Sequence, residues 1–178
     1  MKKSLSLLLV CALLVFAMPC ALADGTTTLT TTVPANATYT LNIPADQTIE
    51  FGTQSVDLTV PYITDASGFA AGKNVQVTIT YTDFTSKDVD TTLSVSLSGK
   101  YSVWNQYNRQ YDTYYVPLEK SGSTLIYKGE SSGGVGDHTY QTESKIVEFD
   151  KLRVSISGWG NALGGDYSST ITFTSKVI

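Results

Sequence analysis

The sequence has 178 residues, with 12 Lys and Arg against 16 Asp and Glu, and its net charge is −4. This acidic balance argues against binding to nucleic acid, whose phosphates require clustered basic residues, and against electrostatic attachment to anionic lipid. The length suits one domain with a sizeable core.

The N-terminal residues predict a signal peptide over 1–23. Two lysines at positions 2 and 3 precede an apolar run over 5–17, and Ala21-Leu22-Ala23 forms a small-x-small cleavage site. A retained anchor and a lipoprotein linkage at Cys20 are the less favoured alternatives. We therefore expect an exported bacterial protein, of the Gram-positive type, that is secreted or held at the cell surface without membrane contact after cleavage.

The mature chain is then expected to be a single domain over 24–178. Both cysteines, Cys11 and Cys20, leave with the signal peptide. Exported proteins use disulfides freely. Because this one has none after cleavage, packing and backbone pairing must hold the mature fold together.

Apolar and polar residues alternate with period two in several segments. Such alternation predicts strands with one face in the core and one in water. The predicted strands lie near 39–43, 75–82, 93–97, 101–104, 111–118 and 170–174. Over 146–156 the apolar parity changes from odd (Val147, Phe149) to even (Leu152, Val154), which predicts a bulge or short break around Asp150 and Lys151.

Turn-forming residues punctuate these runs. They gather near 34–36, 44–46, 65–68, 71–74 and 158–165, and a Gly/Ser-rich flexible loop is predicted over 129–136. No stretch of ten residues has helical periodicity. The pattern predicts an all-β fold, an immunoglobulin-like antiparallel β-sandwich of about 8–10 strands.

Several segments together resemble a known class of domain. The segments are 32–34, 39–45, 52–60, 71–79 and 165–174, with Ala71-Gly72-Lys73-Asn74 in the middle and Gly165-Asp166-Tyr167 near the end. They resemble the secreted adhesion-type domains of Firmicutes and are similar to WxL-like and fimbrial-type sandwich domains of bacterial surface proteins. The resemblance implies an exported sandwich that acts by contact. Trp159 is followed by Gly160 and Asn161, so the peptidoglycan attachment of a Trp-x-Leu motif is not implied.

One segment is unusually rich in aromatic residues. Rings and polar side chains mix over 104–115, and the candidate binding residues are Trp104, Tyr107, Arg109, Tyr111, Tyr114 and Tyr115. Such rings suit stacking on sugars, and Tyr, Trp and Arg also dominate protein interfaces. The structural alternative is a long hairpin with a polar tip at 105–110, whose rings cover the sheet.

The residues of enzyme sites are sparse in this sequence. His138 is the one histidine, and it follows Gly136 and Asp137 in the predicted flexible loop, where we interpret it as an exposed loop residue. Catalytic groups need a preorganised position. We therefore expect no catalytic residues and no cofactor.

Three carboxylates lie close in sequence. Asp83, Asp88 and Asp90 are weak candidates for calcium ligands, but Lys87 lies among them and the spacing is not that of an EF-hand. A solvated acidic turn is the preferred interpretation, so no metal site is expected.

The leading hypothesis is thus a non-catalytic extracellular module that contacts a protein or matrix partner. The first alternative is a carbohydrate-binding module that uses the hairpin from Trp104 to Tyr115. The second is a pilin-like subunit that donates an extended, Thr-rich strand over 26–33 to a neighbour.

Overall fold

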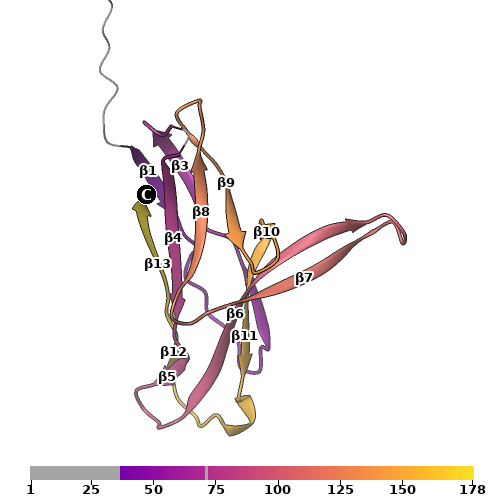
Figure 1. Ribbon diagram of the computed structural model, residues 1–178. Helices are drawn as coiled ribbons and strands as arrows, with labels where there is room; N and C mark the ends of the chain where they lie inside the picture. The colour runs from indigo at the N-terminus through magenta and orange to yellow at the C-terminus, as the bar shows by residue number, and fades with distance from the viewer. Residues whose placement is uncertain (1–36, 71) are drawn as a thin grey trace, which may run out of the picture. The chain divides into compact units, whose positions relative to one another are not determined.

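Strands in antiparallel pairs make up the regular structure of the described chain (Figure 1). The computed structural model describes residues 37–70 and 72–178, all within the unit that spans residues 33–178. The strands are β1 (Thr38–Asn42), β2 (Ser55–Leu58), β3 (Tyr62–Ser67), β4 (Asn74–Tyr81), β5 (Phe84–Ser86), β6 (Thr92–Asn105), β7 (Gln110–Leu118), β8 (Ser123–Gly129), β9 (Val135–Gln141), β10 (Ile146–Val147), β11 (Lys151–Ser157), β12 (Tyr167–Ser168) and β13 (Ile171–Val177).

The all-β prediction is confirmed, but the described residues contain more strands than the expected 8–10. The additional strands β2, β5, β10 and β12 have two to four residues each, which is too few for alternation to reveal them. The one helical element among the described residues is a 3₁₀ turn, η1 (Trp159–Asn161). None of these residues lies in a helix long and apolar enough to cross a membrane. The predicted signal peptide, the turn at 34–36 and the strand at 26–33 lie outside the described residues.

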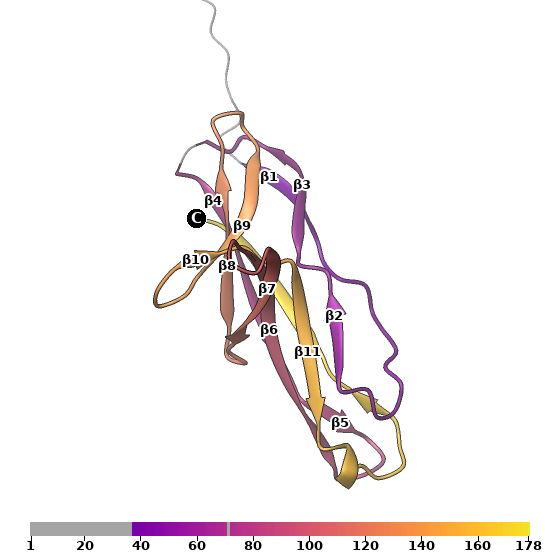
Figure 2. The ribbon, with the colours of Figure 1, turned by 90° about the vertical axis from the view of Figure 1, so that its right-hand side faces the viewer.

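Two sheets form a sandwich-like arrangement. The first has the order β10-β9-β8-β4-β13. The second has the order β12-β5-β6-β11-β2, with β7 paired to β6 on the edge opposite β11. Figure 2 shows β6, β11 and β2 side by side. A small third sheet pairs β1 with β3.

The core lies between the two sheets, where alternation places apolar side chains on facing surfaces. The first sheet contributes Val75, Val77, Ile79, Leu125 and Tyr127, and the second contributes Leu93, Val95, Leu97, Leu152, Val154 and Ile156. All of these side chains are buried. Burial of this apolar surface, at roughly 25 cal/mol per Å², supplies the main stabilising term of a fold without disulfides.

The predicted break near Asp150 is confirmed and marks a change of sheet. β10 pairs with β9 in the first sheet, while β11 pairs with β6 and β2 in the second. Residues 148–150 connect them outside any strand. Because the chain passes from one layer to the other, both apolar parities point into the same core: Phe149 and Leu152 are buried alike.

Candidate functional site

The β6–β7 hairpin extends beyond the sandwich (Figure 1). β11 pairs with β6 as far as Lys100. From Tyr101 to Asn105, β7 is the one described strand that pairs with β6. The two strands stay paired up to Asn105 and Gln110. The outer part of the hairpin, residues 103–111, is called the hairpin tip below. The hairpin predicted from the sequence is thus confirmed.

Asparagine side chains build the turn of the hairpin tip. The backbone N–H of Arg109 donates to the carbonyl of Asn105 at 2.9 Å, and the N–H of Tyr107 donates to Oδ1 of the same asparagine at 3.0 Å. Asn105 Nδ2 in turn donates to Asp112 at 2.6 Å. Arg109 closes the turn in the left-handed region, with φ of 55°. These bonds fix the turn through side chains that need no core around them.

One face of the hairpin carries Trp104 and Tyr111. They are direct cross-strand partners, with ring centroids 5.1 Å apart and an edge-to-face angle of 64°. Tyr115 has the same parity as Tyr111 and lies near the base, where the guanidinium of Arg153 sits 4.9 Å from its ring centroid. Trp104 and Tyr111 remain 50% and 67% exposed.

Tyr114 belongs to the opposite face of the hairpin. Its ring stacks on the ring of Tyr101 at 5.4 Å, and the ammonium of Lys145 lies 4.5 Å from the Tyr101 ring and 5.5 Å from the Tyr114 ring. Contacts of this kind contribute about 0.5–1 kcal/mol at exposed sites. Tyr114 therefore helps to hold the base of the hairpin in place.

The six candidate residues consequently do not form one surface. Trp104 contacts Tyr111, and it lines a shallow hollow at the hairpin tip together with Tyr107 and Tyr114. Tyr114 and Tyr115 also contact cationic side chains nearer the base, and they remain 44% and 45% exposed. Tyr107 is 101% exposed. The accessible aromatic side chains thus lie along a projecting hairpin, and three of them border a shallow hollow at its tip.

The three aspartates near β5 have separate surroundings. Asp83 accepts hydrogen bonds from the Val95 N–H at 2.7 Å and the Lys120 ammonium at 2.6 Å. The Lys120 hydrogen bond, followed by that of Val95, holds the pKa of Asp83 below its usual value. Across residues 37–70 and 72–178, no group of three or more His, Cys, Asp or Glu is placed to hold a metal ion.

The interpretation of His138 as an exposed loop residue is wrong. The turn that joins β8 to β9 is shorter than the glycine pattern suggested, so His138 lies within β9 and is half-buried. Its Nε2 accepts the N–H of Phe149 at 2.8 Å, and its ring lies against those of Tyr127 and Phe149. Burial lowers the pKa of His138 despite the nearby carboxylates of Glu148 and Asp137. The neutral ring is therefore a structural acceptor at the sheet crossing.

A concave surface that sequence reasoning missed lies at the end of the sandwich near η1. Here residues 47–51 and 159–167 and the side chain of Phe84 enclose a cavity with a volume of about 720 Å³. Its apolar lining consists of Ile49, Phe51, Phe84, Trp159, Ala162 and Leu163. We call it the end cavity. Volumes of 300–1,000 Å³ are typical of ligand pockets.

Trp159 anchors one wall of the end cavity. Its indole N–H donates to the carbonyl of Thr53 at 2.9 Å, and its ring packs edge-to-face on Phe51 at 5.3 Å. The half-buried Trp159 also packs against the core. Phe51, by contrast, is 80% exposed.

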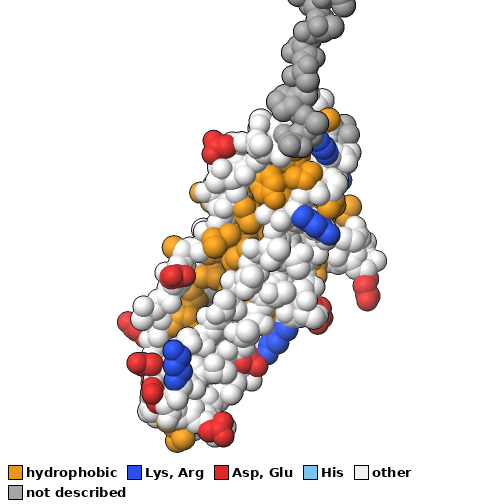
Figure 3. Space-filling model, turned by 90° about the vertical axis from the view of Figure 1, so that its left-hand side faces the viewer, with side chains coloured by type: hydrophobic (Ala, Val, Ile, Leu, Met, Phe, Trp, Pro, Cys, Tyr) orange, Lys and Arg blue, Asp and Glu red, His pale blue; other side chains and the backbone are white. Residues whose placement is uncertain are grey.

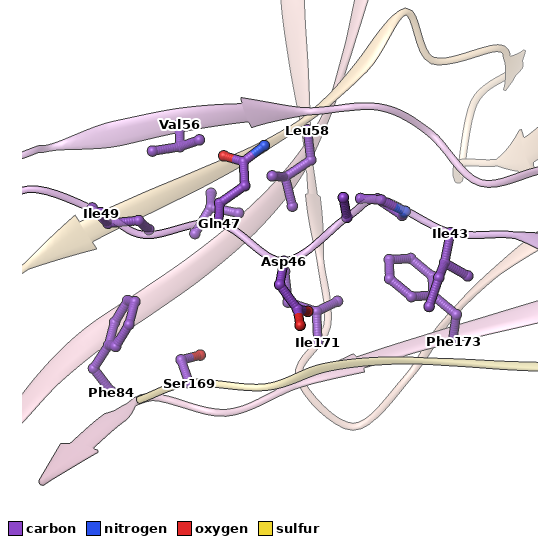
Figure 4. Close-up of a pocket in the computed structure, with 13 residues that line it drawn as sticks. Ile43, Asp46, Gln47, Ile49, Val56, Leu58, Phe84, Ser169, Ile171 and Phe173 are labelled. Atoms are coloured by element: carbon purple, nitrogen blue, oxygen red, sulfur yellow. The ribbon is translucent and has the colours of Figure 1, made fainter. Parts of the chain in front are cut away.

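A smaller groove of about 180 Å³ continues from the end cavity, with which it shares Gln47, Ile49 and Phe84 (Figure 4). Residues 43–49 cross it between Val56 and Leu58 of β2 and Ile171 and Phe173 of β13. Figure 3, which views the side where β1 and β13 lie, shows hydrophobic side chains in a band along this face.

Comparison with known proteins adds no relative. No family model matches the chain, and no curated protein or solved structure matches it. The resemblance to WxL-like and fimbrial-type domains therefore stays a prediction.

Proposed function

We propose that this protein is an exported, non-catalytic contact module of the bacterial surface that binds a protein partner through its hairpin tip. The observation that carries the proposal is the projection of Trp104, Tyr107 and Tyr111 into solvent at the end of a paired, side-chain-braced hairpin. Exposed aromatic side chains on a pre-organised element lose little entropy on binding. They are also the residues that most often dominate protein interfaces.

The arrangement of the rings favours a protein over a sugar. Stacking on a pyranose requires an open, flat ring face, whereas Trp104 and Tyr111 meet edge to face at 64°. Tyr114 and Tyr115, which would widen a platform, each have a ring contact at the base of the hairpin, with Tyr101 and with Arg153. A projecting hairpin whose rings lie at different angles fits a groove on a partner better than it fits a glycan chain.

The surroundings of His138 support a non-catalytic role. Its Nε2 is already occupied by the Phe149 N–H, so this nitrogen has no free lone pair to activate a nucleophile. This histidine instead helps to position the chain where it passes from one sheet to the other.

The proposal is tested by binding of the labelled chain from Asp24 to purified extracellular matrix proteins and, in parallel, to a glycan array. We expect saturable binding to a protein, weakened at least tenfold by Trp104→Ser/Tyr111→Ser, since hot-spot aromatics are worth about 2 kcal/mol or more. Tyr62→Ser, which removes an exposed ring from β3, is the matched control and should bind like wild type. Glycan binding that depends on Trp104, or protein binding indifferent to the double substitution, would overturn it.

A further inference from the structure

The end cavity presents an apolar surface that is costly to leave in water. Phe51 and Leu163 lie on its rim with 80% and 56% of their surface exposed. They come from segments more than a hundred residues apart, yet both border the same hollow. Full burial of such a side chain against a partner contributes about 1.5–3 kcal/mol of favourable free energy.

Most of the charges around the end cavity are negative, and Lys87, next to Asp88 in sequence, is the exception. Asp166 lines it, and Glu50 lies between the two lining residues Ile49 and Phe51. A side chain on Gly165 would come within 3.6 Å of Asp88 Cβ, so Asp88 lies beside the same rim. The ion pairs formed within the described residues involve other carboxylates, Asp57 and Asp83. Figure 3 shows several acidic side chains towards the lower end of the molecule, with a basic side chain among them.

The hairpin tip has the complementary properties. It projects from the sandwich, it exposes Trp104, Tyr107 and Tyr111, and Arg109 is the one charged residue over positions 103–111. Asp112, the cross-strand partner of Val103, adds one negative charge at the inner end of the tip, where it accepts a hydrogen bond from Asn105. A projection with exposed rings and an arginine in its turn and an apolar hollow with a mostly acidic rim therefore occur in the same chain.

The two surfaces lie at opposite ends of strand β6. Gly158, which precedes η1, packs beside Thr92 and Leu93 at the start of β6, whereas the hairpin tip follows the other end of this strand. Fourteen residues of strand separate them by roughly 45 Å at 3.3 Å per residue. A tip cannot fold back to the cavity of its own molecule without breaking β6.

We propose that the hairpin tip of one copy of this chain occupies the end cavity of a second copy. This inference rests on the proposed contact function and names its partner. Because the two surfaces differ, the contact is heterologous, and each bound copy still offers a free tip at one end and a free cavity at the other. The product is an open head-to-tail chain of molecules.

The test uses sedimentation velocity of the chain from Asp24 between about 10 μM and about 1 mM, a range that covers weak association. Wild type should form species that grow with concentration. The tip variant Trp104→Ser/Tyr111→Ser and the cavity variant Phe51→Ser/Leu163→Ser should each stay monomeric. A mixture of the two variants retains one good tip and one good cavity, so it should form dimers and stop there.

Salt and charge provide a second, independent readout. Raising the ionic strength should weaken wild-type association, and Arg109→Gln should both weaken it several-fold and reduce its dependence on salt. If a double variant fails to fold, Tyr107→Ser and Leu163→Ser replace it, because each changes one exposed side chain.

A wild-type chain that stays monomeric over this range, or a mixture of variants that forms no dimer, would overturn the inference. A mixture that grows beyond dimers would also overturn it, since that requires another contact. Failure here leaves the contact function standing if the hairpin tip still binds a matrix protein. If the hairpin tip does not bind a matrix protein but self-association is intact, the partner of the tip is a second copy of this chain and not a matrix protein.

Discussion

At the scale of single residues, Gly99 shows how a missing side chain can shape the core. It lies on the inward-facing row of β6, and a Cβ placed there would come within 2.2 Å of the Phe149 ring. The ring, which belongs to the connection between β10 and β11, thus fills the position that a side chain of β6 would otherwise occupy. Aromatic cover of a strand glycine replaces the packing that glycine lacks.

We expect Gly99→Ala to lower the free energy of unfolding by about 1–3 kcal/mol, because the added methyl group overpacks a closed core. Gly160→Ala is the matched control, since a Cβ there meets no atom within 4 Å. Urea titration of both variants measures the difference. Equal effects of the two substitutions would contradict the packing of Phe149 on Gly99.

At the scale of elements, the turn of the hairpin tip is subject to two opposing effects. Hydrogen bonds of Asn105 stabilise the turn, whereas the backbone conformation of Arg109 strains it. A non-glycine residue in the left-handed region pays roughly 1–2 kcal/mol of steric cost. Arg109 adopts φ of 55° because its N–H closes the turn onto Asn105. An arginine at this position therefore lowers the local stability of the turn.

Arg109→Gly should therefore slow amide hydrogen exchange across the outer β6–β7 pairs by several-fold, equivalent to about 0.5–1 kcal/mol of local stability. Gln106→Gly lies in the same turn without a positive φ, so it gains nothing and should speed exchange. Hydrogen exchange measured by mass spectrometry on the hairpin distinguishes the two. Faster exchange in the Arg109 variant would show that the turn carries no strain.

Alternation predicted β1, β4 and β13, because each has one face more buried than the other. The change of parity predicted the break between β10 and β11. It divided β6 in two, with separate strands near 93–97 and 101–104, whereas the structure has one strand of 14 residues. The interruption is Gly99, where the apolar side chain is supplied by Phe149. A pattern read along one strand cannot show a ring that comes from a connecting segment elsewhere in the chain.

At the scale of the whole molecule, the passage between the sheets depends on a titratable residue. His138 in the first sheet accepts the N–H of Phe149, just before the chain enters the second sheet. Protonation would remove this acceptor and place a charge among aromatic rings. Burial already lowers the pKa of His138 from its ordinary value of 6.5.

The sign of the resulting pH dependence follows from linkage. Below about pH 6.5 the unfolded chain binds a proton that the folded protein resists, so stability should fall as the pH decreases from about 7.5 to about 5.5. The pKa values of Asp57 and Asp83 are lowered from 3.8, so their contribution to the free energy of unfolding is lost only in more acidic solution. His138→Gln keeps an acceptor that does not titrate, and its urea midpoint should change less over this interval. Parallel profiles for the two proteins would exclude the histidine as the cause.

The candidate site was predictable in part. Period two alone separates Tyr114 from Tyr111 and Tyr115, so the division of the aromatic residues between two faces follows from the sequence once the hairpin is accepted. The end cavity could not be foreseen. Its walls come from 47–51 and 159–167, which carry no alternation. The contact of Phe51 with Trp159, and the hydrogen bond from the indole to the carbonyl of Thr53, join segments far apart in the sequence.

Strand β6 runs without interruption from the core into the hairpin tip, which has a mechanical consequence. A pull on the tip along this strand is transmitted to its ladder with β11, where seven residue pairs from Lys100↔Lys151 to Ser94↔Ser157 lie in register. Hydrogen bonds in an antiparallel ladder run perpendicular to the strands. Such a load shears them together instead of opening them one at a time, so the molecule is built to resist tension applied at the tip.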